Sequence, residues 1–93
     1  MRRTDALRLV AALGAIEMAL VRRDDVAGPL LAQAARAAAA TPVDAWVAEA
    51  ARLVRAPGCF GDAPHEMARR SAVQALCRAS AQGAQAALLT GTE

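Results

Sequence analysis

The sequence predicts an all-α fold in which four helices form two antiparallel hairpins. Alanine, the strongest helix former, accounts for 27 of the 93 residues. Apolar residues recur at helical spacing in four segments, and glycine or proline residues stand between most of these segments. A chain of this length holds one hydrophobic core, so residues 1–93 are expected to form a single domain.

The first helix is expected over residues 5–22, with Thr4 or Asp5 as its N-cap. It carries two apolar stripes, so both sides of this helix need cover. Glu17 is expected at the edge of these stripes, either at the surface or in a salt bridge to a partner, and the alternative is a buried functional carboxylate. One stripe consists of Leu9, Leu13, Ile16 and Leu20, and the other of Leu7, Val10, Met18 and Val21.

The second and third helices are expected over residues 26–40 and 42–55. Asp24 or Asp25 is available to cap the second helix, although the following Gly28-Pro29 pair leaves its first residue open. A face of leucine and alanine lets this helix fold back on the first. Thr41-Pro42 is the sharpest boundary in the chain, and it predicts Thr41 as the next N-cap with Pro42 at the first helical position.

The fourth helix is expected over residues 63–88. Pro57-Gly58 is predicted to end the third helix, and Asp62 is the expected cap of the fourth. The apolar face of the fourth helix weakens beyond Gly83, and the segment from Thr90 onward is expected to fray.

The charge pattern argues against nucleic acid and membranes as partners. The net charge is +2, and nine acids are interleaved with eleven arginines along most of the chain. The arginine pairs lack the aromatic stacking residues that single-strand binders use.

Arg2-Arg3 followed by an apolar stretch resembles a signal peptide, but Asp5, Arg8 and Glu17 interrupt the pattern. We therefore expect no membrane span and a cytoplasmic protein.

Few residues are candidates for chemistry. Cys59 and Cys77 fit neither a disulfide framework nor a zinc pattern, and both are expected to be free thiols. His65 lies six residues after Cys59, but a thiol and imidazole pair also needs an orienting group and an oxyanion site, which the sequence does not indicate. We expect no enzyme activity, metal or cofactor, and the reactivity of Cys59 stays open.

The two predicted hairpins resemble tetratricopeptide repeats. That repeat is a helix-turn-helix of about 34 residues, with small residues where the helices cross and a proline after the second helix. In the first hairpin, Gly14 follows Leu13 in the first helix, and Ala27 and Ala34 are small residues of the second helix. Pro42 is the proline after the second helix. The fold is therefore expected to be either tetratricopeptide-like or a four-helix arrangement.

Three stretches also resemble the small tetratricopeptide-like co-chaperones of needle subunits in bacterial type III secretion systems. The first joins an apolar helix, an Arg-Arg-Asp-Asp turn and a leucine-rich helix, and the second places Ala-Arg-Leu-Val-Arg-Ala-Pro before a glycine-containing loop. These stretches run from Leu7 to Leu31, from Ala50 to Asp62, and from Ala75 to Cys77.

This resemblance implies a cytosolic co-chaperone that pairs with a second small helical protein and holds the apolar C-terminal helix of the needle subunit. Binding a helix in a groove needs an apolar concave face and no catalytic residue. The candidate face consists of Leu13, Ile16, Leu20, Trp46, Val47 and Leu53, and the alternative is that all six are ordinary core residues.

Two other classes remain open. A self-associating helical bundle, acting as a structural or regulatory subunit, would use the two-sided first helix to meet its own copy. A regulator that binds nucleic acid would gather its arginine pairs on one surface and lose affinity steeply with salt.

Overall fold

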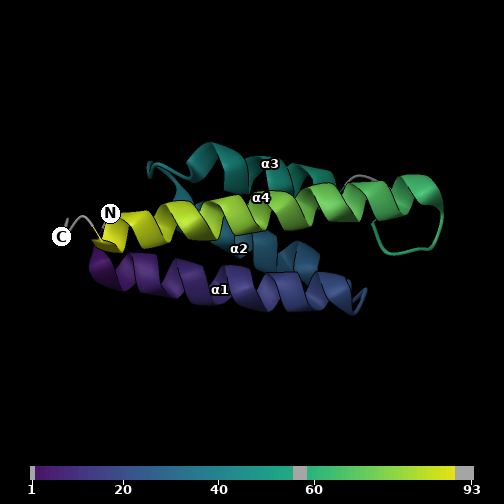
Figure 1. The fold of residues 1–93 in the computed structure, drawn as a ribbon, viewed down its shortest axis with the longest axis horizontal. Helices are drawn as coiled ribbons and strands as arrows, with labels where there is room; N and C mark the ends of the chain where they lie inside the picture. The colour runs from purple at the N-terminus through teal and green to yellow at the C-terminus, as the bar shows by residue number, and fades with distance from the viewer. Residues whose placement is uncertain (1, 56–58, 90–93) are drawn as a thin grey trace.

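The computed structural model describes residues 2–55 and 59–89, and it confirms the all-α prediction. The described residues form helices α1 (Arg3–Val21), α2 (Ala27–Ala38), α3 (Asp44–Arg55) and α4 (Pro64–Leu89), and they contain no strand. The helices run alternately in opposite directions, so α1 begins and α4 finishes at the same end of the molecule (Figure 1). The expected and observed helix ends differ by at most two residues. The predictions made for Pro57-Gly58 and for the segment from Thr90 lie outside the described residues.

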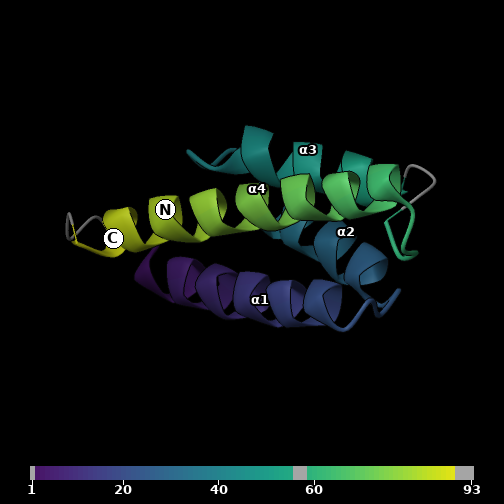
Figure 2. The same ribbon diagram turned by 45° about the vertical axis from the view of Figure 1, so that its right-hand side comes forward.

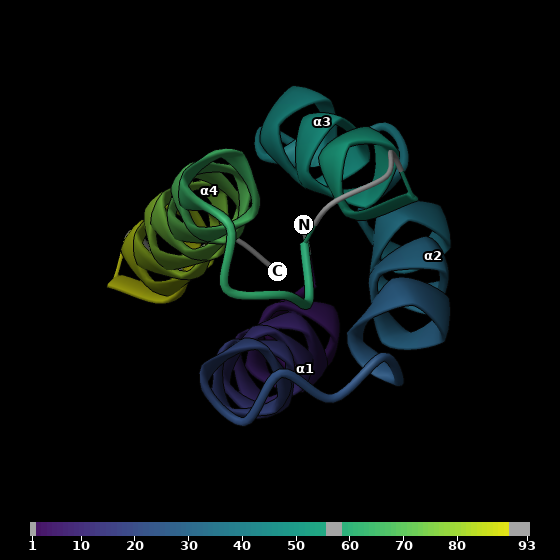
Figure 3. The same cartoon turned by 90° about the vertical axis from the view of Figure 1, so that its right-hand side faces the viewer.

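The four helices form a closed ring in chain order (Figure 3). Helix α1 packs against α2, α2 against α3, α3 against α4, and α4 returns to pack against α1. Helices α1 and α4 lie lengthwise beside each other in both side views (Figures 1 and 2). Among the described residues, no Cα atom of α1 lies within 8 Å of a Cα atom of α3, and the same holds for α2 and α4. Of the two arrangements that the sequence leaves open, the chain thus adopts the four-helix one.

One continuous core fills the ring. Helix α1 supplies its largest side chains, while alanines of α2, α3 and α4 let the neighbouring helices approach closely. Gly83 lets α4 lie close to the start of α3, because a Cβ atom at this position would lie 2.6 Å from Cγ1 of Val43, the residue before α3. The fully buried side chains include Leu13, Ile16, Leu20, Leu31, Val43, Val47, Val73, Cys59, Cys77 and Ser80.

Helix α1 ends in a Schellman motif. The N–H of Arg23 donates to the Leu20 carbonyl at 3.1 Å, and the N–H of Asp24 donates to the Ala19 carbonyl at 2.8 Å. This motif places Arg23 in the left-handed region, with φ of 55°, where glycine is the usual residue. The Arg23 side chain pairs with Asp62 in the connection before α4. The pair joins two turns that are 39 residues apart in the sequence.

Several predicted caps are wrong. Helix α1 begins at Arg3, so Thr4 and Asp5 lie within its first turn and do not cap it. Asp62, predicted to cap the fourth helix, pairs with Arg23 instead. Asp24 comes closer to its expected role, since its Oδ1 accepts the N–H of Val26 at 3.0 Å just before α2 begins.

The connection between α2 and α3 also differs from the prediction. Thr41 does not cap α3, because its hydroxyl and its N–H both donate back to the carbonyl of Ala38, at 2.5 Å and 3.0 Å. Ala40 takes a left-handed backbone with φ of 63° to complete this turn. The first residue of α3 is Asp44, so Pro42 precedes the helix rather than starting it.

Arg70 holds the connection before α4 against that helix. Its Nη1 donates to the carbonyls of Cys59 and Gly61, at 2.9 Å and 3.1 Å. Cys59 is buried in this connection, with its thiol 3.6 Å from the carbonyl of Leu53.

None of the described helices combines the length and the apolar composition that a bilayer crossing requires.

Candidate functional site

Four of the six residues predicted to bind a partner lie in the core of this chain. Leu13, Ile16, Leu20 and Val47 are each no more than 1% exposed. Leu53 is half-buried and packs against the same core. The structure thus brings these five residues together in the interior. Their role toward a partner stays a prediction, and it requires the ring to open.

Trp46 is the one predicted residue with a large exposed surface. It is 46% exposed, and it lies beside the close crossing of α3 and α4, with its Cζ3 atom 3.6 Å from the position of a Cβ atom on Gly83. The indole thus covers part of this crossing and offers its remaining surface to solvent.

The side of α1 opposite the core carries a second apolar stripe. Leu7, Met18 and Val21 are 52%, 54% and 62% exposed, large fractions for side chains of this type. Between them lie two exposed small residues. The five positions follow steps of four, three, four and three residues, which is the heptad spacing of helices that pack side by side along their length. We call this set the outer stripe; it consists of Leu7, Ala11, Gly14, Met18 and Val21.

Gly14 at the centre of the outer stripe has no role within the chain that needs a glycine. Its backbone is helical, and a Cβ atom at this position would meet nothing within 4 Å in the described part of the chain. Glycine inside a helix costs about 1 kcal/mol relative to alanine. Close approach of another backbone is the usual benefit of such a glycine, and within the described residues no such approach occurs.

Charged residues flank the outer stripe on both sides. Arg8 and Arg22 occupy equivalent heptad positions on the side of α2, and Arg3 and Glu17 occupy equivalent positions on the side of α4. Glu17, whose surroundings the sequence left open, lies 2.8 Å from Arg78 through its Oε1 and the Arg78 Nε. This ion pair joins α1 to α4, and the positive charge of Arg78 offsets the negative charge of Glu17, so the two flanks together are basic.

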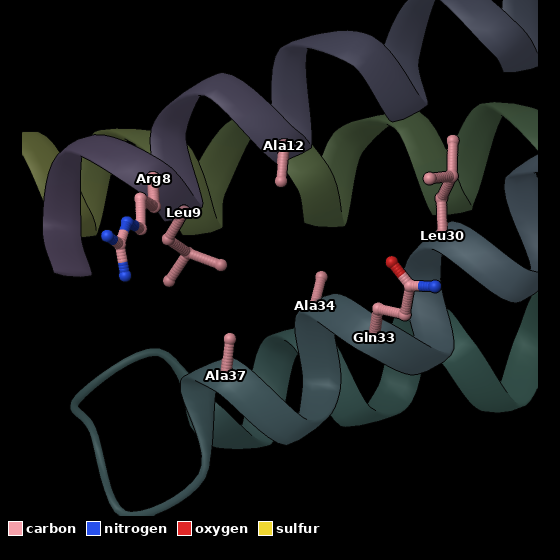
Figure 4. Close-up of a pocket in the computed structure, with 7 residues that line it drawn as sticks. All are labelled: Arg8, Leu9, Ala12, Leu30, Gln33, Ala34 and Ala37. Carbon is pink, nitrogen blue, oxygen red and sulfur yellow. The ribbon is translucent and has the colours of Figure 1, made fainter.

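An apolar hollow of about 210 Å³ lies next to the α2-side flank, between α1 and α2. Ala12 of α1 points across it toward Ala34 and Ala37 of α2 (Figure 4). Arg8 and Gln33 supply polar atoms at its edge. Arg8 belongs both to the lining of the hollow and to the flank of the outer stripe. The remaining lining residues are Leu9 and Leu30.

The two thiols are buried in separate places. Burial raises the pKa of Cys77, and the nearby Glu17 carboxylate adds to this, so that the pKa reaches about 12. Burial also raises the pKa of Cys59, against the opposing effect of Arg69 and Arg70. A raised pKa keeps a thiol protonated, and the protonated thiol is a poor nucleophile. His65 is exposed, with its Nε2 3.9 Å from Glu66 Oε1.

In the ranges 2–55 and 59–89, no three metal-binding side chains of His, Cys, Asp or Glu gather in one place. No known family model matches the chain, and no curated protein or solved structure shows significant similarity to it. The role of the outer face of α1 is therefore inferred from its geometry alone.

The sequence predicts only the larger residues of the outer stripe. The sequence predicts Leu7, Val10, Met18 and Val21 as a second stripe, but in the structure Val10 packs against the core. The small residues Ala11 and Gly14 were not included, because small side chains add little to a hydrophobic pattern. The signal that identifies them is the alternation of four and three residues between the larger members.

Proposed function

We propose that this chain is a protein-interaction module that binds a helix of a partner along the outer stripe of α1. The observation that carries the proposal is an exposed apolar stripe at heptad spacing on a helix whose opposite side already fills the core. Heptad spacing matches a second helix packed along α1, since it keeps apolar residues on one line over several turns.

The composition of the stripe supports a helix rather than a flat surface as its occupant. Larger side chains stand toward the two ends of the stripe, and Ala11 and Gly14 form a shallow centre. Small residues at the point of contact let two helix backbones approach closely, while the larger side chains on either side pack around the crossing. A partner that uses the stripe in this way removes the exposed surface of Leu7, Met18 and Val21 from water.

The resemblance to needle-subunit co-chaperones supplies a specific form of this proposal. In that form the chain acts in type III secretion, and its partners are a second small helical protein and the apolar helix of the needle subunit. Leu13 is buried in the folded chain, so the predicted face would make this contact only after the ring opens. The outer stripe, or the exposed surface of Trp46, would make the contact.

Changing Met18 to aspartate is expected to weaken helix binding without unfolding the chain. Met18 is 54% exposed, so a charge there is solvated in the free protein but loses its water under a partner helix. The measurement is fluorescence anisotropy of a labelled amphipathic peptide with leucine at its a and d positions and glutamine beside them. We expect at least about a tenfold loss of affinity, corresponding to about 1.4 kcal/mol.

Met67→Asp is the matched control. Met67 is 49% exposed but lies on α4, off the outer stripe, so this variant should bind the peptide as the unchanged chain does. Equal loss in both variants would show that the peptide recognises exposed apolar residues in general. Circular dichroism of each variant establishes that the helices are retained.

Gly14→Ala is expected to have opposite effects on the free chain and on binding. Alanine should stabilise the isolated chain by about 1 kcal/mol, because it restricts the unfolded backbone and adds no clash in the described structure. The same methyl group should weaken binding of the peptide helix by separating the two backbones. Urea denaturation measures the first effect and anisotropy the second. Unchanged or tighter binding would place the partner away from Gly14.

A further inference from the structure

The charges beside the outer stripe identify the kind of helix that fits it. We propose that the occupant is an amphipathic helix of a different protein, with acidic side chains along both edges of its apolar seam, rather than a second copy of this chain. This inference rests on the proposed function, since it specifies the partner of the same surface.

The first argument is the sign of the flanks. In paired helices, the residues beside the apolar seam meet those of the neighbouring helix and set the choice of partner. Three of the four charged residues at these positions are arginines, namely Arg3, Arg8 and Arg22. The fourth, Glu17, has Arg78 at 2.8 Å, so it offers little negative charge to a partner. A helix with glutamate or aspartate at its flanking positions therefore meets complementary charge along most of the seam.

The second argument concerns a second copy of α1. In an antiparallel pair, equivalent flanks face each other, which brings Arg8 of one copy beside Arg22 of the other. In a parallel pair, opposite flanks meet, which brings Arg3 beside Arg8 of the other copy. Like charges at these positions oppose both pairings, and in a parallel pair the acid that would relieve the repulsion, Glu17, already has a partner in its own chain.

The third argument concerns where the partner crosses. Gly14 lies at the middle of the outer stripe, halfway between Leu7 and Val21 along the helix. Arg8 and Arg22 stand on one flank, and each is the sequence neighbour of a residue that ends the stripe, Leu7 and Val21 respectively. A partner helix that crosses nearest at Gly14 thus has an arginine near each end of its contact with α1, and its acidic residues are expected about two heptads apart on that edge.

The test uses three synthetic peptides with the same leucine seam. Their flanking positions carry glutamate, glutamine or arginine, and binding to the full chain is measured by fluorescence anisotropy. We expect the glutamate peptide to bind about tenfold more tightly than the glutamine peptide, and the arginine peptide to bind most weakly. The difference should shrink between about 20 mM and about 500 mM salt, because salt screens exposed charges.

Charge reversal in the chain provides the second readout. Arg8→Glu combined with Arg22→Glu should reverse the preference, so that the arginine peptide binds more tightly than the glutamate peptide. Arg55→Glu is the control, because Arg55 is exposed on α3, a helix that does not pack against α1. It should leave the order of the three affinities unchanged.

The outcomes separate the two proposals. Equal affinity for all three peptides would overturn the acidic partner while leaving a helix-binding stripe in place. Binding of none of them would overturn both the partner and the proposed function. A dimer of the chain in analytical ultracentrifugation, dissociated by Met18→Asp but not by Met67→Asp, would identify a second copy as the occupant and would also overturn the inference.

Discussion

Replacing Leu13 by aspartate is expected to unfold the isolated chain. Leu13 is 1% exposed at the centre of the core, so the change removes a large apolar side chain and buries a carboxylate with no partner. The loss of a buried leucine alone costs 2–5 kcal/mol in other proteins, and the unpaired charge adds to it, so we expect a loss of at least about 4 kcal/mol. Circular dichroism and urea denaturation measure the result.

Ala11→Asp is the matched control for this prediction. It places the same charge two residues earlier in the same helix, on the exposed outer stripe. We expect it to leave the fold intact with a change of less than about 1 kcal/mol. If Leu13→Asp folds as well as Ala11→Asp, then the face of Leu13 is open to a partner. That result would support the groove that the sequence suggested.

The stability of the chain is expected to fall as the pH rises from 9 to about 12. The pKa of Cys77 is raised from 9.0 in the unfolded chain to about 12 in the folded chain. Below pH 9 the thiol is protonated in both states, so its burial carries no penalty. Between pH 9 and 12 the unfolded chain releases this proton while the folded chain retains it, which favours unfolding. At 1.36 kcal/mol per pKa unit, the free energy of unfolding falls by about 4 kcal/mol across this window.

The composition makes this experiment unusually selective. The chain has no lysine and no tyrosine, so the thiols are the side chains that titrate in this window, ahead of the arginines. Urea denaturation is measured across the window in the presence of a reducing agent. Cys77→Ala should retain only the smaller dependence that comes from Cys59, whose pKa burial also raises. Parallel curves for Cys77→Ala and the unchanged chain would show that the Cys77 thiol is accessible to water.

The sequence predicts the number and the order of the helices well, because these depend on local signals. Helical spacing of apolar residues and the glycine and proline residues between segments suffice to place each helix within two residues of its observed ends. The closure of the ring does not follow from such signals. Contacts between α1 and α4 join the two ends of the chain, and nothing in either segment alone indicates the other.

The details that the sequence missed depend on tertiary partners. Thr41 was a plausible cap for α3, but its hydroxyl satisfies the end of α2. Asp62 was a plausible cap for α4, but Arg23 lies within reach once the two turns meet at one end of the ring. Each residue had two chemically reasonable partners, and the choice between them is made by packing elsewhere in the molecule.

The same reason explains why the predicted partner face was mostly core. Helix α1 has two apolar sides of similar composition, and the sequence does not show which side the other helices cover. Burial of Leu9, Leu13, Ile16 and Leu20 decides this for the folded chain. The surface that remains is identified by the exposure of Met18 and its neighbours, which only the assembled structure provides.

The return of α4 to α1 has a consequence for synthesis on the ribosome. A chain is made from its N-terminus, so the first three helices emerge before α4 is complete. Until then, the side of α1 that α4 covers is open to its surroundings. An unfinished chain thus displays apolar surface on both sides of its first helix, and a factor that binds nascent chains has more to recognise there than on the finished protein.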